Sequence, residues 1–344
     1  MLVLGIETTC DETSVSIVNY DNGKFEILSN VILSQEIHNI FGGVFPEQAF
    51  RKHQENIIPI LSQALEVIDN IREIDLIGVS AYPGLLGALA IGVAAAKTIS
   101  QIINKPILPV NHLWAHLLVN FKQLPINNEK YLGIVISGGH TNAFVIENLV
   151  PLRIISISSS LDDSIGEAFD KVARMLKLPF PGGPVIDKLA QAYKNKMNNK
   201  KFELLFPIPN PENYSFSYSG LKTAVKNYLD KNPNFCLEQV CFSFQYSAVK
   251  HVINKLEKMV LDFGIKKVLV GGGVAANSFL REELNLLRSR LGIEVFIPEP
   301  TLCTDNAAMV AIAAVFIHLS RFQISDEFDI YPSQMEGDHI WNTI

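Results

Sequence analysis

The chain has 344 residues, 48% of them hydrophobic and 19% charged, and a formal net charge of −6. This length and composition favour a large core divided between two lobes and exclude a disordered chain. The negative balance means that nucleic acid could be bound only by a local basic patch, not by the overall field. The lysines that could form such a patch, or a solvated surface, are Lys194, Lys196, Lys200, Lys201, Lys222 and Lys226.

The cysteines and the first residues predict a cytoplasmic protein. The four cysteines show no CxxC spacing, which favours reduced thiols over a disulfide framework. A strand begins at once with residues 2–6 (LVLGI), so no secretory signal is expected. The most apolar segment, from Leu85 to Ala96, is roughly a dozen residues long and too short to cross a bilayer. We therefore expect no membrane contact.

Two segments share a pattern of strand, tight polar turn and second strand. Residues 5–9 (GIETT) align with residues 133–137 (GIVIS), and at the same offset Thr13 aligns with Thr141. In each copy the second strand should pair back on the first. In the first copy, the turn at residues 21–23 (DNG) leads into a third strand at 25–28.

The segments after each copy alternate between helical and strand patterns. After the first copy we expect a helix at about 46–68, a strand at 76–80, a helix from 85 and a strand at 106–110. After the second we expect a strand near 154–157, helices near 164–176 and 184–193, helical elements between 216 and 263, a strand at 268–270 and a helix at 278–291. The prediction is an α/β fold of two related lobes with a cleft between them. The first lobe would span residues 1–125, with a helix at 305–322 packing back on it, and the second, with a helical insertion, residues 126–304.

A pair of histidines follows the strand at 106–110. His112 and His116 are four residues apart, so on a helix both imidazoles face one side and can reach one cation. Asp305 lies between another apolar run and a helical pattern. Two imidazoles and one carboxylate would leave open positions at which a metal could act on a substrate. A pair of solvated helix histidines is the alternative.

The two polar turns differ in chemistry. The turn at 137–141 (SGGHT) offers backbone N–H groups where glycine permits close approach, as an oxyanion or phosphate requires. Its counterpart at 9–13 (TCDET) carries Asp11 and Glu12, which could supply an acid, a base or cation ligands. An ordinary glycine-rich hairpin is the alternative for the first turn.

Two further glycine-rich segments could hold a nucleoside. Residues 271–277 (GGGVAAN) close a strand and open a helix, where a base or ribose can pack and Asn277 can hydrogen-bond. The loop at 181–184 (PGGP), which includes Gly183, is followed by Asp187 one helical turn later. Either Asp187 or Asp170 could hold ribose hydroxyls. Tight turns and surface acids are the alternatives.

Duplicated lobes with paired phosphate turns resemble the actin, sugar-kinase and heat-shock ATPase superfamily. Within it the chain resembles the tRNA adenosine threonylcarbamoyltransferase family, which older usage called O-sialoglycoprotein endopeptidases. The resemblance spans about residues 1–320, and the SGGHT form is typical of the bacterial and organellar branch. Tyr218 stands where the family usually has Phe, and the tail after about Asp326 contains none of the strings that carry the resemblance. The strings that carry the resemblance are 5–13 (GIETTCDET), 111–116 (NHLWAH), 137–141 (SGGHT), 170–171 (DK), 181–184 (PGGP), 216–222 (FSYSGLK), 272–277 (GGVAAN) and 303–306 (CTDN).

The resemblance implies a transferase with two actin-like ATPase lobes. It would move the threonylcarbamoyl group from threonylcarbamoyl-AMP to the exocyclic amine of the adenosine beside the anticodon, in tRNAs reading codons that begin with A. It implies one divalent metal at His112, His116 and Asp305, either Fe(II), which is favoured, or Zn(II). It also implies a paralogous actin-like subunit and a small P-loop ATPase as partners. Further implied roles are leaving-phosphate contacts at Val135, Ile136, Ser137, Gly138 and Gly139, nucleoside contacts at Asp170, Gly183, Asp187 and Asn277, and proton transfer by Asp11 or Glu12.

Four other functions are alternatives to this one. A zinc protease would need the helix signature H-E-x-x-H, and Leu113 occupies the place of its glutamate and cannot take a proton. A small-molecule kinase would hold magnesium through carboxylates and would not require paired histidines. A small-molecule O-carbamoyltransferase is the nearest alternative, because related domains share the metal and nucleotide strings. A non-enzymatic scaffold would leave these residues without a use.

Overall fold

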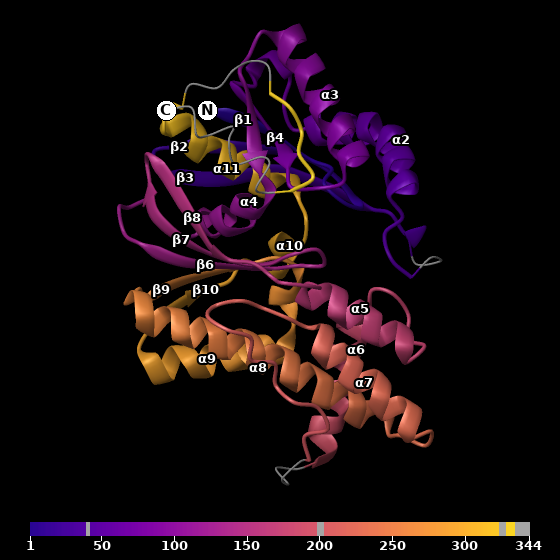
Figure 1. Ribbon diagram of the computed structural model, residues 1–344. Helices are drawn as coiled ribbons and strands as arrows, with labels where there is room; N and C mark the ends of the chain where they lie inside the picture. Colours follow the sequence, from indigo (N-terminus) through magenta and orange to yellow (C-terminus); the bar gives the residue numbers. More distant parts are fainter. Residues whose placement is uncertain (39–41, 198–202, 323–327, 334–344) are drawn as a thin grey trace.

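The computed structural model describes residues 1–38, 42–197, 203–322 and 328–333. It contains two five-stranded sheets with the same strand order, β3-β2-β1-β4-β5 in the first and β8-β7-β6-β9-β10 in the second (Figure 1). In each sheet the first three strands in sequence are antiparallel, and the last two add in parallel. The repeated order confirms the predicted duplication and the mixed α/β class.

The strands follow the predicted apolar runs but are mostly longer. The third strand, expected at 25–28, extends to Ser34 because it pairs with β2 along the whole length of that strand. The first sheet consists of β1 (Leu2–Glu7), β2 (Glu12–Asp21), β3 (Lys24–Ser34), β4 (Leu76–Tyr82) and β5 (Ile107–Asn111). The second consists of β6 (Tyr131–Ile136), β7 (Thr141–Leu149), β8 (Leu152–Ser158), β9 (Lys267–Gly271) and β10 (Glu294–Phe296).

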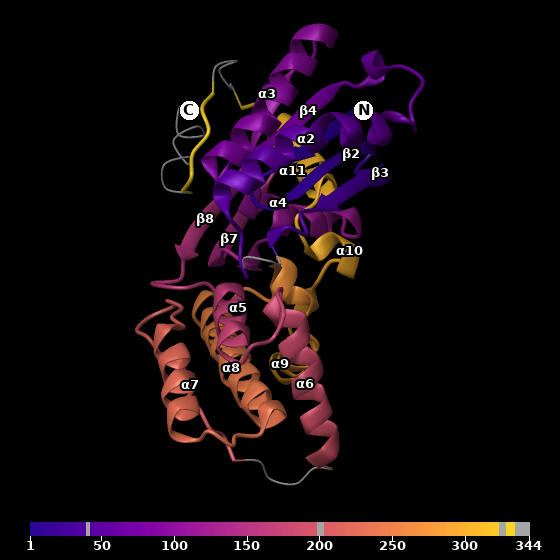
Figure 2. The same cartoon turned by 90° about the vertical axis from the view of Figure 1, so that its right-hand side faces the viewer.

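Helices and sheets alternate in five layers (Figures 1 and 2). On the outer face of the first sheet lie α2 (Pro46–Leu65) and α3 (Leu86–Ile103). Between the sheets lie α4 (His112–Leu118) and α11 (Ala307–Leu319). The outer face of the second sheet is covered by α5 (Ile165–Met175), α6 (Gly182–Met197), α7 (Ser219–Lys231), α8 (Leu237–Phe263) and α9 (Ser278–Leu291). Short helical turns are η1 (Ile71–Glu73), η2 (Val119–Lys122), η3 (Gly273–Ala276) and α10 (Pro300–Cys303).

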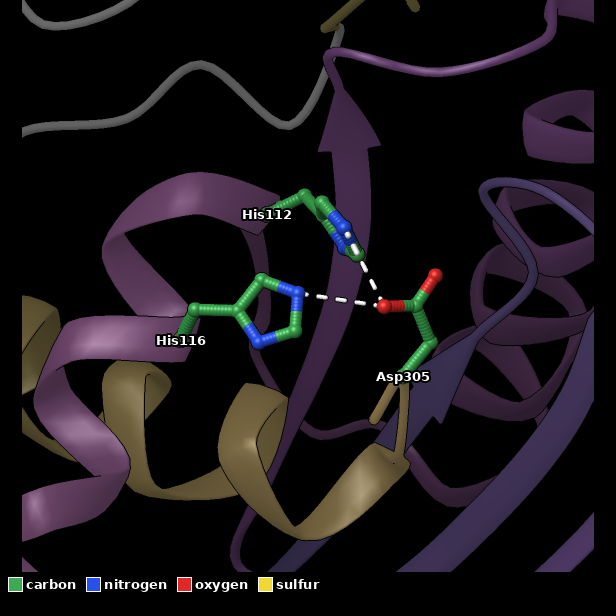
Figure 3. A group of neighbouring side chains, drawn as sticks. All are labelled: His112, His116 and Asp305. Carbon is green, nitrogen blue, oxygen red and sulfur yellow. Dashed lines mark hydrogen bonds and ion pairs between the residues drawn. The ribbon is translucent and has the colours of Figure 1, made fainter. Parts of the chain in front are cut away.

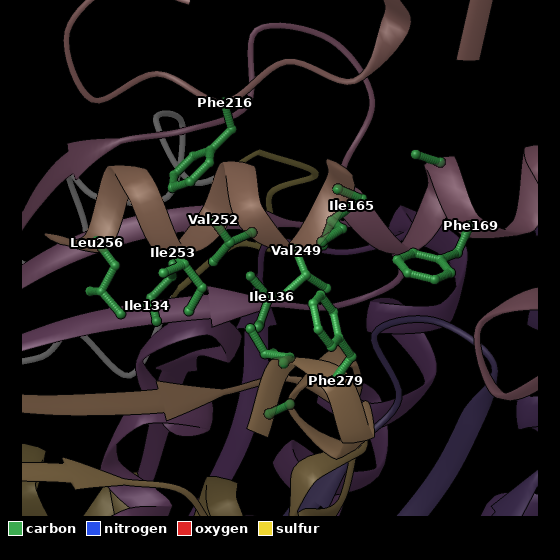
Figure 4. Packing of buried hydrophobic residues seen from close by; sticks show 14 of the residues in the cluster. Ile134, Ile136, Ile165, Phe169, Phe216, Val249, Val252, Ile253, Leu256 and Phe279 are labelled. Carbon is green, nitrogen blue, oxygen red and sulfur yellow. The ribbon is translucent and has the colours of Figure 1, made fainter. Parts of the chain in front are cut away.

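The core of the second lobe forms between its sheet and these outer helices. Ile134 and Ile136, which alternate along β6, belong to the same buried cluster as Val249 and Ile253 of α8 (Figure 4). The residue between them in the strand, Val135, faces the other way and belongs to the core between the two sheets. Both faces of this strand are therefore buried, which explains why its sequence is apolar throughout instead of alternating.

The two middle helices are exchanged between the sheets. Helix α4 continues from β5 of the first sheet but packs against β6 and β9 of the second, while α11 packs against β1 and β4 of the first. Glycines permit both contacts: a Cβ at Gly133 would lie 2.5 Å from Leu117 of α4, and one at Gly5 would lie 2.1 Å from the Ala307 carbonyl of α11. The lobes therefore share a packed middle layer, and the boundary at residue 125 stays a prediction.

Helix α3 is longer than expected. At 18 residues it is, among the described residues, the one helix long and apolar enough to cross a membrane, so the expectation that this segment is too short was wrong. It packs against β4 and α2, however, and its Lys97 donates to the Phe328 carbonyl at 3.0 Å. The Phe328 side chain is buried on the same outer layer. These contacts make α3 a helix of the first lobe. Of the tail after Asp326, the structure describes residues 328–333.

His251 of α8 predicts a loss of stability in acid. It is buried against Phe216 and Tyr218, and burial, with a contribution from the positive Lys255, lowers its pKa to about 4. As the pH falls below about 6.5, this histidine becomes protonated in the unfolded chain but not in the folded one. The free energy of unfolding therefore decreases between about pH 6.5 and pH 4. Between pH 7 and pH 5 the free energy of unfolding of the wild type should fall by about 2 kcal/mol more than that of the His251→Leu variant. Urea unfolding at both pH values measures this; equal losses in the two proteins would contradict it.

Candidate metal centre and nucleotide site

The helix that carries the histidines is fixed at its first residue. The Asn111 side chain accepts hydrogen bonds from the backbone N–H groups of Leu113 and Trp114, which caps α4 where β5 ends. His112 and His116 then lie one turn apart, both buried, with ring centroids 4.7 Å apart and nearly perpendicular. The predicted spacing therefore does bring both rings to one face, and the alternative of solvated helix histidines was wrong.

Asp305 reaches the histidines from the other end of the chain. It lies between α10 and α11, just before Asn306, whose side chain caps α11 by accepting from the Met309 N–H. One Asp305 carboxylate oxygen lies 3.1 Å from His116 Nε2 and 3.6 Å from His112 Nε2 (Figure 3). One ligand atom from each of the three residues lies within 4.8 Å of the others. The three predicted metal ligands thus converge.

The donor set fits a divalent cation. Burial alone would lower the pKa of His112, but the charges of Glu7 and Asp305 outweigh it and raise that pKa to about 9. Burial opposes ionisation of Asp305 as well, yet His112 and His116 hold its pKa well below the usual range. The buried group therefore pairs two carboxylates with one imidazolium, which leaves a negative charge that a cation can neutralise. Two imidazole nitrogens and a carboxylate suit Fe(II) or Zn(II).

The first polar turn lies beside this group. Its backbone is held by His53 of α2, whose ring nitrogens contact the Thr13 hydroxyl at 2.9 Å and the Cys10 carbonyl at 3.0 Å. Asp11 and Glu12 on this turn are partly buried. Burial, then the negative charges of Asp305 and Asp11, raise the pKa of Glu12 well above its ordinary value. A carboxyl that holds its proton so strongly, next to the three ligands, is placed to exchange protons with a bound group.

The second polar turn also lies near the histidines. The Ser137 N–H donates to the His140 carbonyl at 2.8 Å, and the His140 ring is 6.4 Å from that of His112. The side chains of Val135 and Ile136 are buried in the core, so only their backbone could meet a ligand. This turn and the metal ligands therefore border one region.

The glycines of this turn face open space. A Cβ at Gly138 or Gly139 would meet no atom within 4 Å, and neither residue has a positive φ. Neither position therefore needs glycine for its backbone conformation, and close approach of a phosphate stays the predicted reason for glycine at both. The close packing lies behind the turn instead: a Cβ at Gly166 of α5 would lie 2.4 Å from the Ser137 carbonyl, and one at Gly272 would lie 2.3 Å from that of Ile136.

The expected nucleoside residues form two groups. Asp187 accepts from the Ser278 hydroxyl at 2.7 Å and from Gln245 at 3.0 Å, and Gln245 in turn accepts from the Asn277 amide at 2.8 Å. Asp170 is separate and accepts from the Gly182 N–H at 2.7 Å; burial raises its pKa. A Cβ at Gly183 would enter open space. The structure thus links Asp187 and Asn277 through Gln245, which the sequence did not single out.

The suggested basic patch is largely paired with acids. Lys194 contacts Glu282, Lys196 lies 3.1 Å from Glu238, and Lys222 contacts Asp163. Lys200 and Lys201 lie outside the described residues. These contacts leave the position of a nucleic-acid surface open. The four cysteines are free thiols, as expected.

Comparisons with solved structures identify the fold. The chain superposes on the activator of 2-hydroxyisocaproyl-CoA dehydratase from Clostridium difficile, with a TM-score of 0.51, 17% identity and coverage of 93% of this chain and 96% of that one. It also superposes on full-length HypF in its phosphate- and nucleotide-bound form, with a TM-score of 0.59, 15% identity and coverage of 95% and 47%. These likenesses confirm the predicted fold of two actin-like ATPase lobes.

Sequence comparisons identify the family. A family model described as tRNA N6-adenosine threonylcarbamoyltransferase matches residues 26–312. A relative of that name from Caldicellulosiruptor saccharolyticus is 44% identical over 322 residues, which cover 92% of this chain and 93% of the relative. Another, from Thermotoga neapolitana, is 42% identical over 313 residues, covering 91% and 93%. The chain therefore belongs to the tRNA N6-adenosine threonylcarbamoyltransferase family.

Proposed function

We propose that this chain carries out the transfer reaction of its family with a divalent metal held by His112, His116 and Asp305. The reaction moves the threonylcarbamoyl group from threonylcarbamoyl-AMP to the N6 amine of the adenosine beside the anticodon, in tRNAs that read codons beginning with A. The observation that carries the proposal is the convergence of two buried histidines and the half-buried Asp305, with one ligand atom from each within 4.8 Å of the others. When bound, the metal would supply a Lewis acid that polarises the carbonyl of the transferred group.

The remaining residues have roles that follow from their positions. The N6 amine attacks the carbamoyl carbon, the bond from that carbon to the phosphate oxygen breaks, and AMP leaves with the electron pair. The amine must also lose a proton, and the half-buried turn with Asp11 and Glu12 lies beside the ligands that would hold the carbonyl. The open backbone at Gly138 and Gly139 can donate hydrogen bonds from its N–H groups to the departing phosphate, whereas the Ser137 N–H already donates to the His140 carbonyl.

The nucleoside half of the donor would lie in the second lobe. The linked side chains of Asp187 and Asn277 lie near the start of α9, and the open position at Gly183 lies at the start of α6, where Asp170 accepts from the Gly182 N–H. The hydroxyls of a ribose could donate hydrogen bonds to Asp187 or Asp170, and the small residues before α9 would allow a flat base to approach the backbone. Fe(II) is the metal that we favour, with Zn(II) as the alternative.

Three further assignments complete the proposal. The donor would be made by other proteins, and the family suggests a paralogous actin-like subunit and a small P-loop ATPase as partners. The reaction would take place in the cytoplasm, where tRNA is available. Of the alternatives, a small-molecule O-carbamoyltransferase or a metal-dependent ATPase or kinase of the same superfamily is not favoured by the names of the relatives.

The direct test is AMP release. Purified chain together with the partner subunits is supplied with threonylcarbamoyl-AMP, and AMP is measured with and without unmodified tRNA. We expect AMP to appear in step with the modified nucleoside and only when tRNA is present. Equal AMP release without tRNA, or transfer to a small-molecule hydroxyl in its place, would overturn the proposal.

Gly138→Val tests the phosphate position. The new side chain would enter the open space above the turn, so the fold should be kept while a phosphate is kept out. Calorimetry should show AMP binding weakened by roughly tenfold or more, about the worth of one charged hydrogen bond. Val67→Ala, a change at an exposed position after α2, is a matched control that should bind AMP normally. Normal AMP affinity in Gly138→Val would place the phosphate elsewhere.

A further inference from the structure

Glu7 is a buried carboxylate at the end of β1 that has no separate role in the mechanism proposed so far. Its side chain is fully enclosed, and within the described part of the chain no lysine or arginine pairs with it. One oxygen accepts the Thr9 backbone N–H at 2.6 Å, and the other accepts the Ser80 hydroxyl at 2.6 Å. That second oxygen is also 3.0 Å from Nδ1 of His112. A carboxylate is costly to bury, so this arrangement needs an explanation beyond packing.

The hydrogen bonds fix which nitrogen of His112 carries the proton. A carboxylate only accepts, so the nitrogen facing Glu7 must be Nδ1–H. In the neutral ring Nε2 then holds the free lone pair. Nε2 is also the atom that faces Asp305, 3.6 Å away, beside His116. Glu7 thus turns the lone pair of His112 toward the place where the three ligand atoms converge.

The sheet holds Glu7 itself in place. Strands β1 and β4 are parallel neighbours, with Ile6 opposite Val79, so Ser80 comes alongside Glu7 at the next position. The Thr9 N–H belongs to the turn that directly follows β1. Because one donor is backbone and the other stands on the adjacent strand, the carboxylate cannot rotate without losing a buried hydrogen bond.

We infer that Glu7 is a positioning residue: it holds His112 in the Nδ1–H tautomer so that Nε2 is available to the metal. This inference rests on the metal site proposed above and adds a residue that neither metal nor substrate touches. Partners of this kind behind a ligating histidine typically raise metal affinity by roughly 10- to 100-fold.

Glu7→Gln gives a chemical prediction. The Thr9 N–H is backbone and cannot change, so the amide oxygen of Gln must face it and the NH₂ group must face Ser80 and His112. His112 would then have to accept at Nδ1 and carry its proton on Nε2, which blocks that atom as a ligand. The size of the side chain is unchanged, so the fold should be kept. Glu283→Gln is the matched control, since it neutralises another buried glutamate, paired with Lys250 on the far outer layer.

Two measurements on the purified full-length chain test the inference. Titration with Zn²⁺ should show affinity reduced roughly 10- to 100-fold in Glu7→Gln and unchanged in Glu283→Gln. Nitrogen-15 NMR of the metal-free histidines should show Nδ1 of His112 protonated in the wild type and in Glu283→Gln, but unprotonated, with the proton on Nε2, in Glu7→Gln, a change that general destabilisation would not cause. Thermal melts without metal establish that each variant is folded.

Ser80→Ala keeps the test decisive if Glu7→Gln does not fold. It leaves the carboxylate but removes the hydroxyl that holds it, and should lower Zn²⁺ affinity by a smaller factor. Wild-type affinity and an unchanged tautomer in the folded variant or variants would overturn the role of Glu7 while leaving the metal site intact. Failure of the wild-type chain itself to bind Zn²⁺ or Fe²⁺ would instead overturn the proposed function.

Discussion

The double variant His112→Ala, His116→Ala should contain less than roughly a tenth of the metal found in the wild-type chain and should show no threonylcarbamoyl transfer. Both imidazoles contribute one ligand atom to the converging group, and Asp305 alone cannot hold a divalent cation. Elemental analysis after purification and dialysis measures the metal directly. His318→Ala, at an exposed position near the end of α11, is the control and should retain a full equivalent.

The double variant also removes the partner of Glu7, and this bears on how the result is interpreted. A buried carboxylate left without its imidazole destabilises a fold by about 3–5 kcal/mol, so a lower melting temperature is expected. His116→Ala alone keeps the contact between Glu7 and His112 and should melt closer to wild type while still losing the metal. Retention of one equivalent of metal in the folded His116→Ala chain would remove this site from the proposal.

The sequence predicted the parts of the site that depend on local spacing. His112 and His116 are recognisable because four residues make one helical turn, and the strand before them indicates where that helix begins. The duplicated turns are recognisable because apolar strands flank them. These features can be predicted because they depend only on residues that are close together in the sequence.

Contacts between distant segments could not be predicted in the same way. Glu7 and Ser80 meet only because β1 and β4 become parallel neighbours, and Gln245 reaches Asp187 and Asn277 only because α6, α8 and α9 pack on one face. The packing around the glycines is a second example. Gly138 and Gly139 look constrained in the sequence but face open space, whereas Gly166 and Gly272 are constrained by the backbone behind the turn. Which side of a turn is crowded depends on the tertiary packing.

Asp305→Asn should abolish metal retention and tRNA modification while leaving the fold intact. The asparagine has the same size, so the contacts of α11 with β1 and β4, and its capping by Asn306, should remain. Its amide is a poor metal ligand beside two imidazoles, and the negative charge that a cation would neutralise is reduced. We expect at least roughly a 100-fold fall in modified nucleoside formed per unit time.

This variant also tests whether metal and lobes are coupled. The histidines come from the first lobe, and Asp305 follows a strand of the second, so metal binding and cleft closure should favour each other by the same free energy. The lobes share the packed layer of α4 and α11 even without metal, so the metal-free melting temperatures of variant and wild type should agree. Added Zn²⁺ should raise the melting temperature of the wild type but not that of the variant.

The measurement is the yield of modified nucleoside from purified components, with thermal melts in parallel. Asp262→Asn is the matched control: it makes the same change at an exposed residue that pairs with Tyr214, and it should behave as wild type in both assays. The mechanism requires Asp305 as an anionic ligand. An Asp305→Asn chain that melts normally and transfers threonylcarbamoyl at the wild-type rate would therefore exclude the metal mechanism, even though the chain would still belong to the family.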